Sequence, residues 1–154
     1  MGTYFLDSSA IVKRYVVESG QSFVLTLCDP NQSHYLYISQ IAFVEVVASL
    51  CRRTRENSIT ITDRDKLINT FRLHCQKVYG IQRLNSAVLT SASNLCRTHR
   101  LRAYDAEQLA CSLQLRAKAL ANGVSAPTFV CADNNLISIA SLEGLSIENP
   151  NNYP

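Results

Sequence analysis

The fold is decided first by residues 3–9, which read TYFLDSS. An apolar run that ends in an acid and is followed by two serines is typical of a strand leading directly into a helix. We therefore predict a strand over residues 3–7 and a helix that Ser8 and Ser9 cap and that continues to about Glu18. Gly20 is expected to end this helix, and the whole unit is the first half of a βαβ motif.

Outward from this stretch, short apolar runs alternate with longer segments of helical period. This alternation is typical of an α/β fold built around a parallel sheet. The expected strands cover residues 3–7, 34–38, 81–84, 127–132 and 145–147. The expected helices cover residues 8–18, 23–28, 39–51, 62–79, 85–99, 104–121 and 133–142. We predict a single domain over residues 1–148 and a frayed tail over residues 149–154.

The composition is that of one compact globular domain. Of the 154 residues, 47% are hydrophobic, and the net charge of +3 permits an anionic partner without requiring one. Nothing after Met1 resembles an export signal, and no apolar run approaches the roughly 20 residues that span a bilayer, so we expect a cytoplasmic protein that binds no membrane. The cysteines are spaced singly and are interpreted as core thiols: Cys28, Cys51, Cys75, Cys96, Cys111 and Cys131.

Most of the twelve Asp and Glu residues have ordinary structural explanations. Asp29 belongs to a turn, while Asp63 and Asp65 favour the start of a helix. The remaining acids of this kind lie in polar or terminal contexts and are interpreted as solvated carboxylates: Glu18, Glu56, Glu107, Glu143 and Glu148.

The acids that these explanations do not cover are Asp7, Glu45, Asp105 and Asp133. Asp7 and Asp133 each close an apolar strand, and the carboxyl ends of parallel strands share the edge where open α/β sheets bind ligands. Glu45 is flanked by apolar residues on a helix that leaves a strand end, and Asp105 lies in the first turn of its helix. Taken singly, Asp7 or Asp105 has an alternative role as a helix cap or a dipole-compensating acid. Together, the four carboxylates are expected to converge in one pocket.

A group of carboxylates held together at neutral pH needs a cation, because the charges repel one another. Oxygen ligands select hard ions, so Mg²⁺, or Mn²⁺ in its place, is the expected cofactor. A metal pocket of this kind supports the hydrolysis of phosphodiester bonds.

The four acidic motifs also resemble those of a known family. Asp7 in YFLDSSA, Glu45 in FVEVVA, Asp105 in LRAYDAEQLA and Asp133 in FVCADNNL are similar, in order and spacing, to the successive acidic motifs of PIN domains. The resemblance spans nearly the whole chain and is closest to the VapC-type toxins of bacterial toxin–antitoxin pairs. It implies a three-layer α/β/α sandwich with a mostly parallel central sheet, Mg²⁺- or Mn²⁺-dependent cleavage of RNA, homodimerisation, and inhibition by a cognate antitoxin. Asn135 stands where some relatives carry a further polar or acidic group, which leaves the number of metal ions open.

Two further sets of residues are expected to support such a site. Ser8 and Ser9 are candidates to hydrogen-bond a metal-binding carboxylate, with helix capping as the ordinary alternative. Arg97, Arg100 and Arg102, which lead into Asp105, are the expected RNA contacts, with compensation of a helix dipole as their alternative.

Other parts of the sequence have weaker assignments. A second basic run stands at Arg52, Arg53 and Arg55. Tyr15 or Tyr104 is a candidate to stack on a base, although aromatic residues in apolar patterns more often belong to a core. The apolar residues between Leu67 and Leu95 exceed what one core requires and are the expected dimer surface.

Two other functions remain open from the residues alone. The same fold and site suit a housekeeping nuclease of RNA processing. A receiver-like Mg²⁺-binding signalling domain also places carboxylates at strand ends, but it needs a Lys after a late strand, and no Lys follows Lys118. A dinucleotide-binding domain is disfavoured, because Asp-Ser-Ser, and not a glycine-rich turn, follows the first strand.

Overall fold

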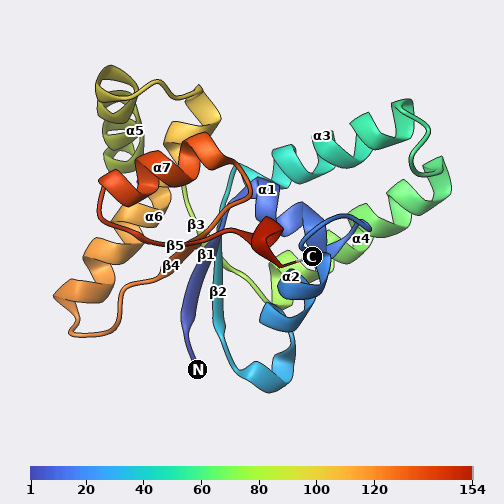
Figure 1. Ribbon diagram of the computed structural model, residues 1–154, viewed down its shortest axis with the longest axis horizontal. Helices are drawn as coiled ribbons and strands as arrows, with labels where there is room; N and C mark the ends of the chain where they lie inside the picture. Colours follow the sequence, from blue (N-terminus) through green and yellow to red (C-terminus); the bar gives the residue numbers. More distant parts are fainter. Residues whose placement is uncertain (154) are drawn as a thin grey trace.

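The structure, a computed structural model, describes residues 1–153. A five-stranded parallel sheet forms its centre, in the order β3-β2-β1-β4-β5 (Figure 1). The strands are β1 (Thr3–Leu6), β2 (Tyr35–Ser39), β3 (Gly80–Gln82), β4 (Thr128–Val130) and β5 (Ser146–Glu148). The expected parallel sheet is therefore confirmed.

The helices cover both faces of this sheet (Figure 1). One layer contains α1 (Ser8–Ile11), η1 (Val12–Arg14), α2 (Gln21–Leu27), α3 (Ala42–Arg55) and α4 (Ile61–Lys77). The other contains α5 (Ser86–Thr98), α6 (Ala103–Ala121) and α7 (Asn134–Leu142). Two short 3₁₀ segments, η2 (Pro30–Gln32) and η3 (Pro150–Asn152), complete the elements. The predicted three-layer α/β/α sandwich is confirmed.

Alternation along the central strands creates two separate cores. Phe5 of β1 and Phe129 of β4 are fully buried against α5, α6 and α7, with their rings stacked 5.9 Å apart between centroids. The next residues, Leu6 and Val130, point to the opposite face and pack with α1 to α4. Because successive side chains of a strand point to opposite faces, one apolar run supplies both cores.

The strand order reverses on either side of β1, since β2 and β4 both pair with it in parallel. The chain leaves β1 at Asp7 and leaves β4 just before Asp133, so both acids lie at the carboxyl edge of two adjacent strands. This is the topological switch point at which open α/β sheets form ligand crevices.

The helix predicted over residues 8–18 is wrong beyond Ile11. The chain tightens there into the 3₁₀ turn η1, in which the Tyr15 amide donates to the Val12 carbonyl at 2.9 Å. This turn buries Lys13, whose ammonium donates to the Ser19 carbonyl at 2.9 Å. The apolar spacing of residues 11–16 predicts a continuous α-helix, but the chain forms a 3₁₀ turn in which the Lys13 ammonium contacts Ser19.

The frayed tail is also a wrong prediction for the residues that the structure describes. Pro150 is buried within η3, and the ring of Tyr153 stacks on Phe23 with centroids 4.4 Å apart. Gly20 makes this packing possible, because its φ is +80° and a Cβ there would lie 2.5 Å from the Pro150 carbonyl oxygen. The C-terminal segment therefore packs next to α2 (Figure 1).

The cysteines depart in part from the expected core assignment. All six are free thiols, and four are buried, but Cys51 is half-buried and Cys96 is exposed. Cys96 follows the buried Leu95 in α5, but its own side chain points away from the core. Apolar neighbours in the sequence therefore do not make it a core residue. None of the helices within residues 1–153 combines the length and apolar character that a bilayer-spanning segment requires.

Candidate active site

The four acids selected from the sequence line one cavity of about 410 Å³. Each comes from a different part of the fold: Asp7 follows β1, Glu45 lies in the first turn of α3, Asp105 lies in the first turn of α6, and Asp133 follows β4. The cavity therefore opens at the carboxyl edge of the sheet, as predicted. Sequence reasoning located these four residues correctly relative to one another.

Asp7 is the most constrained of the four. Its Oδ1 accepts from the Ala10 amide at 2.9 Å and from the Ser9 hydroxyl at 2.7 Å, while the Cys131 thiol donates to Oδ2 at 3.4 Å. Burial raises the pKa of Asp7 to about 6, although these donors act in the opposite direction. Asp7 therefore does serve as the N-cap of α1, and it also lines the cavity.

Glu45 is held by two donors that reach the same oxygen. The Ser8 hydroxyl and the Gln108 side-chain amide each donate to Oε2 at 2.5 Å. The Gln108 amide also donates to the Ser8 hydroxyl at 2.7 Å. A glutamate in an apolar stretch of helix is thus explained by polar partners from α1 and α6.

Asp105 and Asp133 lie close enough for their charges to interact. The pKa of Asp105 is raised by burial first, then by the negative charge of Asp133, and further by that of Glu45, while Arg102 lowers it. Asp133 is exposed, and it caps α7 by accepting from the Leu136 amide at 2.9 Å. Asp133 therefore caps a helix and also lines the cavity, as Asp7 does.

Both serines contact an acid, although neither caps the helix. Asp7 takes the N-cap position of α1, so Ser8 and Ser9 lie inside its first turn. Ser9 donates to Asp7, and its hydroxyl also accepts from the Ala132 amide at 2.8 Å, which ties the ends of β1 and β4 together. The capping alternative for the serines is therefore wrong.

Solved structures with the same architecture provide an independent comparison. FitAcB from Neisseria gonorrhoeae is 13% identical, covers 96% of this chain and 97% of its own, and has a TM-score of 0.58. VapBC2 from Rickettsia felis, solved with a DNA fragment from its promoter, is 15% identical with coverages of 96% and 98% and a TM-score of 0.58. VapBC-1 from nontypeable Haemophilus influenzae is 12% identical with coverages of 96% and 98% and a TM-score of 0.59.

The chain has their fold. The resemblance to VapC-type PIN proteins that the sequence motifs indicated is therefore confirmed at the level of the fold. A scan against protein-family models gives no match, and a comparison with curated proteins gives none either. Because sequence identity is this low, the chemistry has to be argued from the side chains that line the cavity.

The donor set fits a hard divalent cation, although the carboxylates do not form a closed cage. Within residues 1–153, no group of three or more His, Cys, Asp or Glu side chains is placed so that it could hold a metal ion. Mg²⁺ commonly takes only one or two carboxylates and completes its shell with water and substrate phosphate. The four carboxylates line one cavity, and the pKa of Asp105 is raised by burial and then by the charges of Asp133 and Glu45. One or two of these carboxylates, with water, would suit such an ion.

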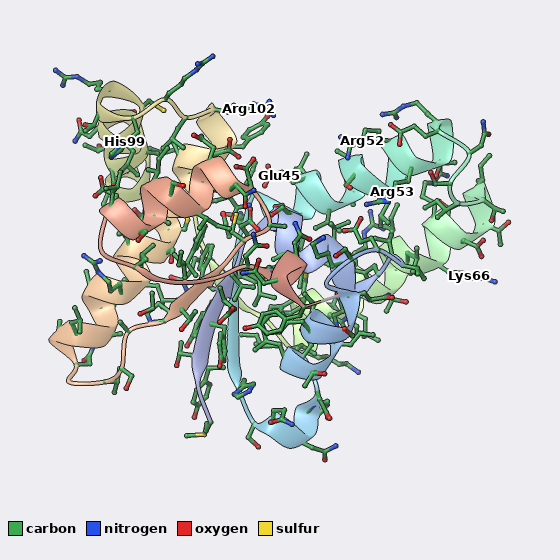
Figure 2. The ribbon with its side chains drawn as sticks, viewed as in Figure 1. Glu45, Arg52, Arg53, Lys66, His99 and Arg102 are labelled. Carbon is green, nitrogen blue, oxygen red and sulfur yellow. The ribbon has the colours of Figure 1, made fainter. Side chains whose placement is uncertain are left out.

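Basic side chains lie on both sides of the acids. Figure 2 shows Glu45 between Arg102 on one side and Arg52 and Arg53 of α3 on the other, and all four residues line the acidic cavity. The sequence favoured Arg97, Arg100 and Arg102 as the RNA contacts over the run that includes Arg52 and Arg53. Only the packing of α3 brings Arg52 and Arg53 to the cavity.

An adjoining cavity of about 500 Å³ continues the basic surface. It shares Asp105 and Asp133 with the acidic cavity and adds Arg100 and Asn135. The Asn135 amide donates to the Arg100 carbonyl at 3.3 Å. Arg97, by contrast, lies in the last turn of α5 and lines neither of these two cavities.

Three polar residues near the site were missed or misread. Glu107 is buried and not solvated, and it accepts from the Ser39 hydroxyl at 2.7 Å. Glu18 is half-buried between Lys13 and Arg53, with which it forms ion pairs. No pattern in the sequence singles out Gln108. All residues from Ala106 to Ser112 are buried in α6, so no periodic pattern distinguishes the inward polar positions there.

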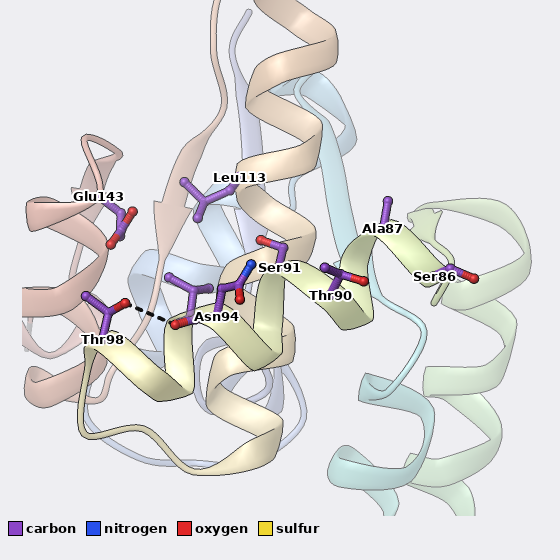
Figure 3. A pocket seen from close by; sticks show the side chains of 9 residues that line it. Ser86, Ala87, Thr90, Ser91, Asn94, Thr98, Leu113 and Glu143 are labelled. Carbon is purple, nitrogen blue, oxygen red and sulfur yellow. Dashed lines mark hydrogen bonds between the residues drawn. The ribbon is translucent and has the colours of Figure 1, made fainter.

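A roomier cavity lies away from these acids, along α5 (Figure 3). It has a volume of about 650 Å³ and small polar side chains on most of its wall. Its one lining carboxylate, Glu143, is paired with His99 at 2.6 Å. This cavity therefore offers no group of acids comparable with that at the switch point.

Proposed function

We propose that this chain is a metal-dependent endoribonuclease and the toxin of a toxin–antitoxin pair that acts in the cytoplasm. The observation that carries the proposal is the convergence of Asp7, Glu45, Asp105 and Asp133, from four separate elements, on one cavity at the topological switch point. The shared fold with the FitAB and VapBC structures supports the toxin assignment.

In this proposal Asp7, Glu45 and Asp105 hold the principal ion, directly or through water, and Asp133 completes the pocket or helps to hold a second ion. The chemistry that Mg²⁺ or Mn²⁺ supplies when bound is the activation of a water for in-line attack on phosphorus and the neutralisation of charge on the departing 3′ oxygen. Hydrolysis of that bond leaves a 5′-phosphate and a 3′-hydroxyl. No side chain of the protein needs to act as a nucleophile.

The remaining lining residues position the carboxylates and the substrate. Ser9 and Cys131 fix the rotation of the Asp7 carboxylate. In this proposal Arg52 and Arg102, which line the cavity on opposite sides of Glu45, bind phosphates on either side of the scissile bond. The lining combines carboxylates with Arg side chains, which suits the phosphates and metal of a single-stranded RNA substrate.

A partner of defined chemistry also fits this region. A mostly apolar cavity of about 590 Å³ is lined by Gln40, Ile41, Phe43, Val44 and Leu84. Val44 precedes Glu45 in α3, so one short stretch of this helix contributes to both cavities. An antitoxin segment that placed an apolar side chain there and an Arg or Lys among the carboxylates would exclude the metal. The neighbouring FitAB and VapBC structures, of which FitAB and VapBC2 were solved with DNA fragments, support the assignment of an antitoxin partner.

Nuclease assays with single carboxylate variants test the proposal. Asp7→Asn, Glu45→Gln and Asp105→Asn are each expected to abolish Mn²⁺-dependent cleavage of RNA while the fold is retained by circular dichroism. Glu56→Gln, which alters an exposed acid at the end of α3, is the matched control and should cleave as wild type does. Wild-type cleavage that persists in excess chelator would exclude a metal-dependent reaction.

A further inference from the structure

We propose that Gln108 is a positioning residue that fixes the metal-binding carboxylate of Glu45. This inference rests on the proposed function, because it assigns a role to Glu45 in holding the ion. Gln108 lies in α6, one helical turn after Asp105 and on the same face, and both residues line the acidic cavity. A single helix thus supplies one acid of the site and the support of another.

The contacts of Gln108 join three elements of the site. Its Nε2 donates to Glu45 Oε2 of α3 at 2.5 Å and to Ser8 Oγ of α1 at 2.7 Å. The Ser8 hydroxyl in turn donates to the same Glu45 oxygen at 2.5 Å. Two donors on one oxygen fix the rotation of the carboxylate, which leaves its second oxygen for an incoming cation.

The orientation of the amide is set by these neighbours. If the amide were turned over, its Oε1 would face the Glu45 oxygen, and two acceptors would be in contact without a proton between them. Nε2 must therefore point toward Glu45 and Ser8. Gln108 has one useful orientation, as a positioning group requires.

The other end of the amide shows that stability alone does not explain this residue. Gln108 is only 2% exposed, and its Oε1 has no hydrogen-bond partner among residues 1–153. A buried acceptor without a partner destabilises a fold, and an apolar side chain of the same size would avoid that cost. A glutamine at this position is explained by its donors, which act on the site.

The test compares Gln108→Met with wild type by two measurements on the full chain. Titration of Mn²⁺, followed by calorimetry or electron paramagnetic resonance, gives the affinity of the ion without reference to RNA cleavage. We expect Gln108→Met to bind Mn²⁺ roughly 10–100-fold more weakly, as is usual when a group that orients a ligand is lost. The thermal midpoint of the metal-free variant should stay close to that of wild type, because removal of the unpaired Oε1 offsets the loss of the Nε2 hydrogen bonds to Glu45 and Ser8.

Gln114→Met is the matched control, since it makes the same substitution in the same helix. Among the residues that the structure describes, the side-chain amide of Gln114 hydrogen-bonds only to Asn85, at 3.4 Å or more. Gln114 lies outside the acidic cavity, so Mn²⁺ affinity should not change. Gln108→Asn keeps the amide but withdraws it by one methylene group. It should lose Mn²⁺ affinity as Gln108→Met does, and it decides the matter if the Met variant proves unstable.

The outcomes separate this inference from the proposed function. If wild type binds Mn²⁺ and cleaves RNA while both Gln108 variants bind Mn²⁺ with unchanged affinity, the positioning role is overturned and the nuclease proposal stands. If wild type neither binds Mn²⁺ nor cleaves RNA, both proposals fail. Weaker binding with an undiminished thermal midpoint supports the positioning role, because a purely structural residue would lower the midpoint as well.

Discussion

The thiol of Cys131 donates a hydrogen bond to the carboxylate of Asp7 at 3.4 Å, across the junction between β1 and β4. Both side chains are buried, so each perturbs the other: burial and the charge of Asp7 raise the pKa of the Cys131 thiol far above its usual range. Cys131 therefore remains a protonated donor at neutral pH. Asp7 carries its charge at a cost in stability, because burial outweighs the hydrogen bonds that this thiol, Ser9 and the Ala10 amide donate to its carboxylate.

The first prediction concerns that cost. The folded-state pKa of Asp7 is about 6, above the unfolded value of 3.8, so its stabilising contribution is present below about pH 4 and is lost as the pH rises through 6. Without metal, Asp7→Asn should increase the free energy of unfolding at pH 7.5 by on the order of 2 kcal/mol and should have little effect at pH 4. Urea unfolding in chelator at the two pH values measures the difference.

Asp65→Asn is the control for this experiment, because Asp65 is exposed and forms an ion pair with its neighbour Arg64 on the surface of α4. Its effect should be small at both pH values. An Asp7→Asn effect of the same size at pH 4 and pH 7.5 would contradict the assigned titration.

The second prediction concerns Glu107, whose pKa is raised mainly by burial. Its Oε1 accepts from Ser39, while its Oε2 is buried without a partner among residues 1–153. Glu107→Gln retains the acceptor and removes the charge, so the thermal midpoint at pH 7.5 should be unchanged or higher. Glu107→Ala removes the acceptor of the buried Ser39 hydroxyl proton, although the Ser39 oxygen still accepts from the Ile41 amide, and should lower stability by about 1–3 kcal/mol. A lower midpoint for the Gln variant would show that Glu107 is stabilised as a charged group.

The third prediction concerns the RNA contacts. Arg100→Ala with Arg102→Ala should weaken RNA binding and reduce the slope of log K against log salt by about 1.4, at about 0.7 for each phosphate contact of a single strand. Filter binding over a range of salt in chelator measures this slope without cleavage. Mn²⁺ affinity should survive, because the carboxylates are intact.

Two single variants test where the RNA lies. Arg52→Ala should reduce the salt slope as well, because Arg52 lines the acidic cavity on its opposite side. Arg72→Ala, on an exposed part of α4, should leave it unchanged. Arg97→Ala tests whether Arg97 contacts RNA, as the sequence predicts, although this residue lines neither cavity. An unchanged salt slope would show that it does not. A double Arg100 and Arg102 variant with the wild-type slope would limit both residues to a structural role.

The fourth prediction is that the protein is a homodimer whose carboxylates are blocked in the cell by a basic partner. Large apolar side chains are exposed on the middle helices, where the dimer surface is expected, including Leu73 at 45% and Leu89 at 53%. Size-exclusion chromatography with light scattering should give twice the mass of the chain. Expression should arrest growth, and co-expression of the neighbouring gene should relieve it, with an Arg-containing peptide competing against Mn²⁺ in vitro. A monomer that cleaves RNA but leaves growth unaffected would favour a housekeeping role in RNA processing.

The sequence by itself was enough to predict the order of strands and helices. It was also enough to select the four acids that line the cavity. Asp7 and Asp133 follow directly from strand ends, and Glu45 stands out as a charge within an apolar run, because these are local properties of the chain. The parallel sheet then places such residues at one edge. Even the boundaries of α6 and β2 differ from the prediction by only one residue.

Only the tertiary structure decided what supports those acids. Gln108 and Ser8 are 100 residues apart in the chain and meet at Glu45 only because α1 and α3 from one layer and α6 from the other converge at the carboxyl edge of the sheet. Likewise, Lys13 is buried against Glu18, and Glu107 is buried against Ser39. The periodicity of the sequence around Lys13 and Glu107 does not reveal these partners. The physical reason is that a polar side chain can be buried only when a specific partner satisfies it, and that partner is chosen by packing between elements, not by the sequence around the residue.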